Sequence, residues 1–342
     1  MKKQAITLFL FLIIIIPNLT AQAKIDSIQL FIDEKPIAVT LVSDFKKLFN
    51  TKKETPWQES VITFRMPDSA TVVTETVQMR ARGNFRKTEC YMPSLMVNFH
   101  NSTSPQLYQL DKLKIVSGCG TATRDEQLVL KEYLAYKMYN LITPLSFRTR
   151  LIRTSFEDSK GKIKKYTTWG FFIEDVDDMA KRNKSKEYET ATEQRNTNPE
   201  RMTLVALFQY LIGNTDWSVP NFHNIKLVTP KDNPTSSPLP IPYDFDFAGM
   251  VDADYATPAE ILGTEKVTER VYRGFPRPLE EINAALNILK AKRNDFNNLV
   301  MNCEQLPLSS RKEIVKYFDG FYKIADNPKD VQRYFIDEAR KN

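Results

Sequence analysis

Apolar and polar residues alternate with a period of two along much of the first half of the chain. This alternation is typical of β-strands with one buried face. Large apolar residues then recur at helical spacing over residues 125–141, which predicts a helix that ends before Pro144. The expected strands cover residues 27–32, 61–64, 71–82, 95–99 and 113–116 before this helix, and 147–156 and 165–174 after it, with a turn at 158–161 between the last two.

The second half of the chain changes character. Residues 181–199 are charged and poor in apolar side chains, which is typical of a solvated helix or a mobile loop. The other elements expected here are an amphipathic helix over 199–212, a hairpin over 224–228 and 240–245, and helices over most of 280–340.

A β-rich first half followed by a mainly helical second half predicts an α+β chain in two lobes. We place a β-rich N-terminal lobe at residues 24–176 and a mainly helical C-terminal lobe, with a hairpin inside it, at residues 177–342.

The N-terminus has the pattern of a secretory signal peptide. Lys2 and Lys3 precede an uncharged run over residues 5–16, and residues 21–23 form the small-x-small motif Ala-Gln-Ala. The run is about 12 residues long, whereas a helix that crosses a bilayer needs roughly 20. We expect cleavage after residue 23 and an exported protein, periplasmic or extracellular, without a stable membrane span. An uncleaved membrane anchor is the alternative.

The charge pattern argues against nucleic-acid binding. The chain has 48 basic and 42 acidic residues and a formal net charge of +6, with the two signs well mixed. A nucleic-acid interface needs basic side chains clustered on one face. A mildly basic protein instead favours anionic partners such as nucleotides or acidic polypeptides.

Three cysteines bear on the compartment. Exposed thiols tend to pair in an oxidising compartment, and Cys90 and Cys119 are close in sequence and both border turn-like segments. We expect a Cys90–Cys119 disulfide, with Cys303 free and buried in a helix. The alternative is three buried thiols that pack as core residues.

Residues suited to phosphoryl transfer gather in the hairpin region. Asp216 lies in a turn after the helix expected at 199–212, Asn224 opens the first strand of the hairpin, and Asp246 ends the second. A hairpin would bring Asn224 and Asp246 side by side. Phosphoryl transfer needs a carboxylate that orients the acceptor and oxygen ligands for Mg²⁺. We therefore assign Asp216 to the hydroxyl acceptor, and Asn224 and Asp246 to the metal.

This region is similar to the catalytic loop and metal-binding segment of protein-kinase-like folds. It most resembles the spore-coat protein H (CotH) family of secreted atypical kinases, through an Asn-x-Asp turn at 214–216, an Asn before a short apolar strand, and Pro-aromatic-Asp-apolar-Asp at 242–246. The resemblance covers most of residues 75–250 in order. It implies a two-lobed kinase-like fold, with ATP and Mg²⁺ as cosubstrate and cofactor.

Two of the metal assignments have alternatives. Asn221 follows Asp216 at the kinase spacing Asp-x-x-x-x-Asn, so it competes with Asn224. Asp-Phe-Asp stands where kinases have Asp-Phe-Gly, so Asp244 competes with Asp246.

The resemblance also implies a set of residues around the nucleotide. They form a loop that approaches the phosphates, an acidic position on the first-lobe helix, and the end of the strand that leads into the hinge. These residues are Arg82, Gly83, Asn84, Glu132 and Glu174. The nucleotide lysine of the family is missing, because Met96 occupies its expected position. Lys87 or Lys114 would have to substitute for it.

The leading hypothesis is an exported kinase that uses ATP and Mg²⁺ to phosphorylate a secreted or envelope protein, or another hydroxyl acceptor. The missing lysine and the scarcity of ATP outside the cytoplasm favour an alternative, a secreted pseudokinase or binding module without catalysis. An envelope scaffold without a nucleotide site is the third hypothesis. Only two His are present, and there is no Walker-type loop or Gly-x-Ser-x-Gly nucleophile motif.

Overall fold

The computed structural model describes residues 29–67, 71–99, 107 and 110–340. The expected signal peptide, residues 1–23, lies outside the described residues. No helix in the described part of the chain is both long and apolar enough to cross a membrane.

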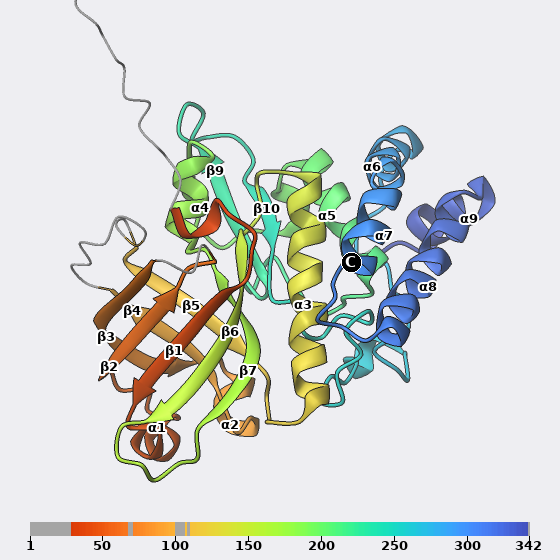
Figure 1. Cartoon of the computed structure of the whole chain (residues 1–342). Helices are drawn as coiled ribbons and strands as arrows, with labels where there is room; N and C mark the ends of the chain where they lie inside the picture. Colours follow the sequence, from red (N-terminus) through yellow and green to blue (C-terminus); the bar gives the residue numbers. More distant parts are fainter. Residues whose placement is uncertain (1–28, 68–70, 100–106, 108–109, 341–342) are drawn as a thin grey trace, which may run out of the picture.

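A closed seven-stranded β-barrel occupies the first half of the chain (Figure 1). The strand order is β1-β2-β3-β4-β5-β7-β6, and neighbouring strands are antiparallel except for β6 and β1, whose parallel pairing closes the barrel. The strands are β1 (Ile37–Ser43), β2 (Gln58–Arg65), β3 (Val72–Arg82), β4 (Ser94–Asn98), β5 (Lys112–Ser117), β6 (Thr149–Asp158) and β7 (Tyr166–Ile173).

Because apolar residues alternate along the strands, their side chains lie on the inner face and fill the barrel. In β1, Ile37, Val39 and Leu41 point inward and are buried, and they pack in one cluster with residues such as Phe64 and Phe172 from other strands. The segment η1 (Gln29–Phe31) adds Leu30 and Phe31 to the same cluster. Burial of this surface stabilises the barrel as a packed core.

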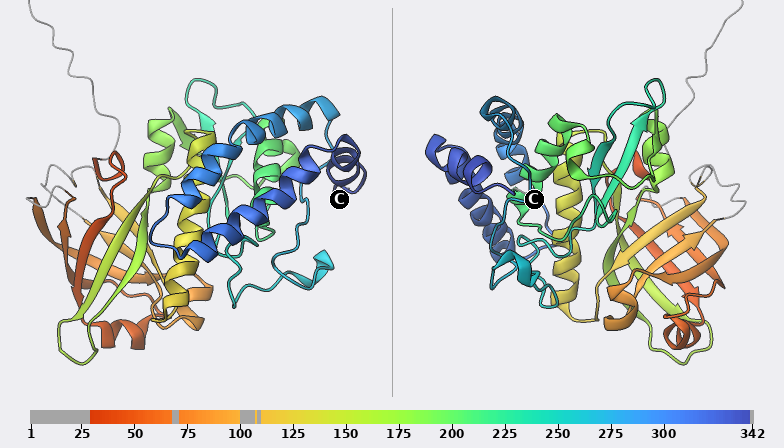
Figure 2. Two further views of the ribbon diagram at one scale, coloured as in Figure 1. Left: turned by 45° about the vertical axis from the view of Figure 1, so that its right-hand side comes forward. Right: turned by 180° about the vertical axis from the view of Figure 1, so that it is seen from behind.

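Helix α3 (Thr123–Ile142) stands between the barrel and the C-terminal helices, and Figure 2 shows the barrel and these helices on opposite sides of it. A three-stranded antiparallel sheet in the order β10-β9-β8 lies beside α5. Its strands are β8 (Ser185–Glu187), β9 (Ile225–Pro230) and β10 (Leu239–Pro242). The other helices are α1 (Phe45–Thr51), α2 (Phe85–Glu89), α4 (Val176–Arg182), η2 (Gln194–Asn196), α5 (Pro199–Ile212), η3 (Glu260–Leu262), α6 (Leu279–Ala291), α7 (Arg293–Met301), α8 (Leu308–Ala325), α9 (Pro328–Gln332) and the π-helical turn η4 (Arg333–Asp337).

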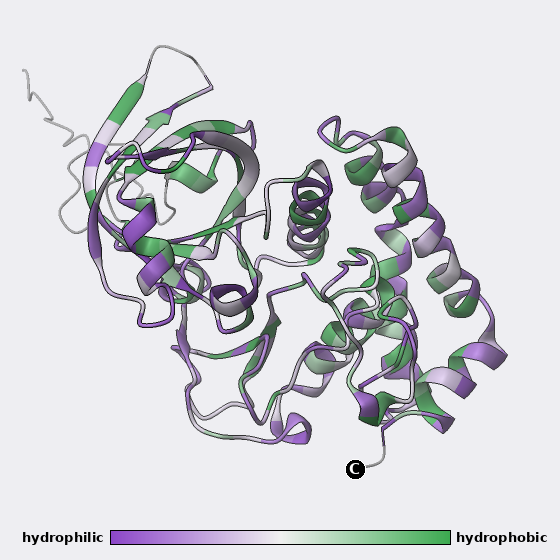
Figure 3. Cartoon of the chain, turned by 90° about the horizontal axis from the view of Figure 1, so that it is seen from below, coloured by the Kyte–Doolittle hydropathy of each residue, from purple (hydrophilic) through white to green (hydrophobic). Residues whose placement is uncertain are grey.

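The C-terminal helices are amphipathic, with hydrophobic and hydrophilic residues on each of them in Figure 3. In α6, Ile282, Ala285, Leu286 and Leu289 recur at helical spacing and are buried. They belong to the same hydrophobic cluster as α3 and α5.

The expected two-lobed protein-kinase-like fold is wrong. The β-rich half is a closed barrel, and the second large hydrophobic cluster runs from Leu151 and Phe171 of the barrel through α3 and α5 to Phe335. Alternation predicts which residues form strands, but not which strands pair. Closure depends on β1 and β6, far apart in sequence, which pair in parallel from Ile37 with Ile152 onward.

Most predicted elements are present, but several differ from the prediction. Part of the strand expected at 27–32 lies outside the described residues, and Gln29–Phe31 is a 3₁₀ helix. Strand β1 and the short helices α1, α2 and α4 were not predicted. Residues 181–199 are neither a solvated helix nor a simple loop, because they include β8 and η2, where Ser185 and Gln194 are buried.

The expected Cys90–Cys119 disulfide is confirmed, with the two Cα atoms 4.6 Å apart. Cys303 is free and buried, as expected, but it lies in the turn after α7 and not in a helix. The disulfide joins the end of α2 to the segment that follows β5, and it closes a loop of 29 residues.

Replacing both Cys90 and Cys119 by Ser should lower the free energy of unfolding by about 3–4 kcal/mol, because the unfolded chain regains the entropy of a loop of this length. Denaturant unfolding with and without reductant measures the effect. The Cys303→Ala variant is the control and should stay sensitive to reductant. Equal stability of the oxidised and reduced wild type would contradict the prediction.

Candidate functional site

A cavity of about 550 Å³ lies where β3, β5 and β7 of the barrel meet the loop after α5 and the β9–β10 hairpin. Its volume is in the range of small-molecule sites. Nine of the predicted site residues line it: Arg82, Gly83, Asn84, Lys114, Asp216, Asn221, Asn224, Asp244 and Asp246. The predicted residues Lys87, Glu132 and Glu174 do not line it.

The turn that carries Asp216 is set by the end of α5. Gly213 caps the helix in the left-handed conformation, at φ +70°, and a Cβ there would lie 1.9 Å from the hydroxyl of Tyr317. The backbone N–H of Asp216 then donates to Oδ1 of Asn214, at 3.0 Å. This Asx turn points the chain from the buried helix to the cavity.

Two neighbours hold the carboxylate of Asp216. Nε2 of His223 lies 2.8 Å from Oδ1 of Asp216, and Nδ2 of Asn224 donates to Oδ2 at 2.9 Å and to the backbone carbonyl at 2.7 Å. The amide of Asn224 is therefore oriented, with its nitrogen toward Asp216. The sequence did not single out His223 or predict this contact.

The hairpin places Asn224 beside Tyr243, one residue before Asp244, and not beside Asp246 as expected, because β10 already ends at Pro242. Pro242 pairs with Ile225, and the N–H of Tyr243 donates to the carbonyl of Asn224 at 3.1 Å. Asn224 and Asp244 both have positive φ, +53° and +60°. Such backbone conformations cost free energy in residues other than glycine and are common at functional sites.

The carboxylate of Asp244 lacks a hydrogen-bond donor among the residues that the structure describes. Its backbone N–H donates to the hydroxyl of Tyr136 at 2.8 Å, which fixes the position of the residue. Burial raises the pKa of Asp244 to about 6, and the neighbouring Asp246 adds to the rise while Arg82 and Arg86 oppose it. A cation placed beside Asp244 would favour its charged form.

Asp246 is held differently, by a buried arginine that the sequence did not single out. Nη2 of Arg86 lies 3.3 Å from Asp246 and 3.2 Å from Glu132, and Nη1 donates to the carbonyl of Ser117 at 2.7 Å. The hydroxyl of Tyr255 donates to Asp246 at 3.2 Å. The carboxylate of Asp246 thus has partners, whereas that of Asp244 has none among the described residues.

Arg86 and the acidic groups around it shift one another's pKa values. Burial alone would lower the pKa of Arg86, but Tyr255, Asp246 and Glu132 together raise it. Burial raises the pKa of Glu132 well above its usual value, and Arg86 opposes that rise. Nothing in the sequence distinguishes Arg86 from the adjacent Lys87, because only the fold places one of them between two carboxylates.

Besides Arg86, the cations Arg82 and Lys114 also line the cavity. No carboxylate of the described residues pairs with Arg82. Lys114 lies 3.9 Å from Asp175, and its ammonium is 5.9 Å from the centre of the Phe147 ring. Burial lowers the pKa of Lys114, and Asp175 opposes this. Lys114 is the register partner of Met96 across β4 and β5, so the cation lies one strand away from the position where the resemblance expects a lysine.

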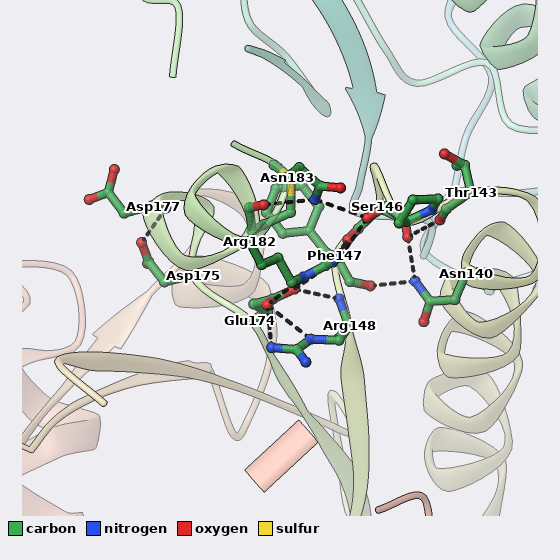
Figure 4. Close-up of polar contacts among 12 residues, drawn as sticks. Asn140, Thr143, Ser146, Phe147, Arg148, Glu174, Asp175, Asp177, Arg182 and Asn183 are labelled. Atoms are coloured by element: carbon green, nitrogen blue, oxygen red, sulfur yellow. Dashed lines mark hydrogen bonds and ion pairs between the residues drawn. The ribbon is translucent and has the colours of Figure 1, made fainter. Parts of the chain in front are cut away.

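Glu174 belongs to a separate ion cluster (Figure 4). Its side chain is fully buried, at 0% exposed, and accepts from Arg148 at 2.7 and 3.0 Å and from Arg182 at 2.9 Å. Arg182 also donates to the carbonyls of Pro144 and Ser146. The cluster ties the end of β7 to α4 and to the segment before β6.

No known family model matches the chain, and no curated protein matches it.

The oxygen atoms of the cavity suit a hard cation with few protein ligands. The described residues contain no group of three or more His, Cys, Asp or Glu side chains that could hold a metal ion. The carboxylate of Asp244 and the amide oxygens of Asn224 and Asn221 are oxygen donors in the lining of the same cavity. Mg²⁺ is often held by one or two carboxylates together with waters and substrate phosphates, so this donor set fits it.

The Glu174→Gln variant should lose about 3–5 kcal/mol of unfolding free energy, because two guanidinium groups keep their charge without the buried counter-charge. Thermal or denaturant unfolding checks this. Asp177→Asn is the control: it lies on α4 but is exposed, and it should change stability little. A Glu174→Gln variant as stable as the wild type would contradict the structural role.

Proposed function

We propose that this protein is an exported kinase that binds ATP and Mg²⁺ in the cavity and phosphorylates a hydroxyl group of a secreted or envelope protein, or of another acceptor. The observation that carries the proposal is that Asp244 lines the same cavity as Arg82 and Lys114. Arg82 and Lys114 would complement the negative charge of a polyphosphate, and Asp244 would complement the positive charge of its divalent cation.

Asp216 would orient the acceptor hydroxyl and accept its hydrogen bond. His223 and Asn224 fix two atoms of its carboxylate, so the group is held in place before any substrate arrives. Positioning of this kind is the main task of the protein in phosphoryl transfer.

Asp244 and Asn224 would hold the metal, and Asn221 is a further candidate. Asn224 uses its Nδ2 for Asp216, which leaves Oδ1 for a cation. Asp246, the first choice from the sequence, already pairs with Arg86, so we move the carboxylate ligand to Asp244. When bound, Mg²⁺ would neutralise part of the negative charge of the phosphates.

Arg82, Lys114 and the loop at Gly83 and Asn84 would receive the phosphates. Gly83 has φ +83°, a conformation that glycine adopts without strain, and Asn84 follows it in the cavity wall. The role of nucleotide lysine goes to Lys114, since Lys87 does not line the cavity.

The resemblance of residues 214–246 to the CotH kinases supports the proposed chemistry. It concerns the site only, because the fold is not the two-lobed one that the resemblance implied. The Cys90–Cys119 disulfide supports export, since disulfides persist mainly in oxidising compartments.

Calorimetric titration with ATP in Mg²⁺ and in EDTA, followed by transfer of labelled γ-phosphate to secreted extract, tests the proposal. We expect Mg²⁺-dependent binding and transfer. Lys114→Ala should weaken nucleotide binding about tenfold or more, as expected for a lost charge-assisted contact. Lys87→Ala is the matched control and should bind as the wild type does. Binding without transfer would instead indicate a binding module, and no binding an envelope scaffold.

A further inference from the structure

Arg273 donates hydrogen bonds to the loop that carries Asp216, at the residues before and after it. Its Nη1 donates to the backbone carbonyl of Thr215 and, at 2.8 Å, to that of Trp217, the two residues that flank Asp216. The guanidinium also lies 5.3 Å from the centre of the Trp217 ring, within the range of a cation–π contact. One side chain therefore fixes both peptide groups next to the acceptor-side carboxylate.

The segment that carries Arg273 is itself hydrogen-bonded to neighbouring elements of the fold. Its carbonyl accepts from Nε2 of Gln194, at 3.3 Å, and Gln194 is 4% exposed. Three residues earlier, Arg270 donates to the carbonyls of Tyr210 and Leu211 at the end of α5, at 3.0 and 3.2 Å, and to that of Tyr317 on α8. The segment with both arginines thus packs against the helix from which the Asp216 loop emerges.

Arg273 reaches the site without lining the cavity. Burial lowers the pKa of Arg273, the nearby Arg340 lowers it further, and Asp216 raises it. An arginine remains charged throughout the working range of pH, so its grip on the two carbonyls does not depend on a titration.

We propose that Arg273 is the positioning residue for Asp216. The inference rests on the proposed phosphotransferase function, in which the carboxylate must stay within hydrogen-bond reach of the acceptor hydroxyl. A displacement of about 1 Å in such a group can slow a reaction about 10²-fold. Arg273 holds the carbonyls of Thr215 and Trp217, whereas His223 and Asn224 hold the carboxylate and the carbonyl of Asp216 itself, so neither replaces the other.

Kinetics of Arg273→Ala provide the first test. We expect kcat to fall about 10- to 100-fold, while the KM and Kd for ATP change less than about twofold. Arg273→Lys keeps a charged donor for the carbonyls and should recover part of kcat. Arg277→Ala is the matched control, because Arg277 lies on the same segment and pairs with Glu281 instead of the loop; it should have wild-type kinetics.

The double variant Arg273→Ala/Asp216→Ala distinguishes an effect of Arg273 through Asp216 from an independent effect on kcat. If Arg273 acts through Asp216, adding Arg273→Ala to Asp216→Ala should not lower kcat further. Multiplied losses in the double variant would overturn the proposal, as would unchanged kcat in Arg273→Ala.

Hydrogen–deuterium exchange of the loop peptide around Asp216 tests the inference without any activity. We expect exchange in this peptide to be faster in Arg273→Ala than in the wild type. The increase should be smaller in Arg273→Lys and absent in Arg277→Ala. If the wild type transfers no phosphate, the proposed function fails, but faster exchange still supports the positioning role. If the wild type transfers phosphate and exchange in both Arg273 variants is unchanged, the positioning role fails and the function stands. Should Arg273→Ala not fold, Arg273→Lys carries both measurements.

Discussion

Replacing Asp216 by Ala should slow phosphoryl transfer by about 10²- to 10⁴-fold, the usual contribution of a positioned acid–base group. Binding of ATP with Mg²⁺ should change less than about twofold. The reason is that Asp216 is assigned to the acceptor, while Asp244, Arg82 and Lys114 are assigned to the metal and the phosphates. The measurements are rates of labelled-phosphate transfer and calorimetric binding on the same preparations.

Asp216→Asn is the matched variant, because it keeps the shape of the side chain and removes its charge. It should bind ATP as the wild type does and transfer phosphate slowly. Its melting temperature shows whether the contacts with His223 and Asn224 survive. Transfer by Asp216→Ala at more than half the wild-type rate would remove Asp216 from the mechanism.

Replacing Asp244 by Ala should weaken Mg²⁺-dependent ATP binding by at least about 10- to 100-fold, the loss typical of changes around a metal site. Binding measured in EDTA should be unaffected, because the lost group contacts the cation and not the nucleotide. The carboxylate of Asp244 has no donor among the described residues, so its removal breaks no internal contact and stability should be kept.

Asp246→Ala should have the opposite profile. It leaves Arg86 buried with one fewer counter-charge, so the free energy of unfolding should fall by about 3–5 kcal/mol. Below its melting temperature the variant should still bind ATP in a Mg²⁺-dependent way. If Asp246→Ala loses this dependence and Asp244→Ala keeps it, the metal ligand is Asp246 and the assignment made here is reversed.

The positions of strands and helices could be predicted from the sequence because burial leaves a local period. Helix 199–212 lies where the pattern places it, although it is buried from Met202 to Ile212 and is not amphipathic as expected. The hairpin after it is also present, but its second strand ends at Pro242 and not at residue 245. The architecture could not be predicted in this way. Barrel closure rests on the parallel pairing of β1 with β6, and no local period reports which distant segment a strand joins.

The cavity could be predicted in part for a similar reason. Its acidic side comes from one continuous stretch, so Asp216, Asn224 and Asp244 could be found together. The choice between Asp244 and Asp246 needed the structure, because it depends on where Arg86 is buried. Arg273 could not be predicted from the sequence either, because it contacts backbone carbonyls near Asp216 and belongs to no recognisable motif.

The most direct test is a crystal structure of the protein with a non-hydrolysable ATP analogue and Mn²⁺, whose anomalous signal locates the metal. The expected result is an anomalous peak about 2.1–2.2 Å from a carboxylate oxygen of Asp244, in keeping with oxygen ligands at such distances. The phosphates should lie beside Arg82 and Lys114. A nucleotide bound away from the cavity, or a cavity that stays empty at millimolar analogue, would contradict the account.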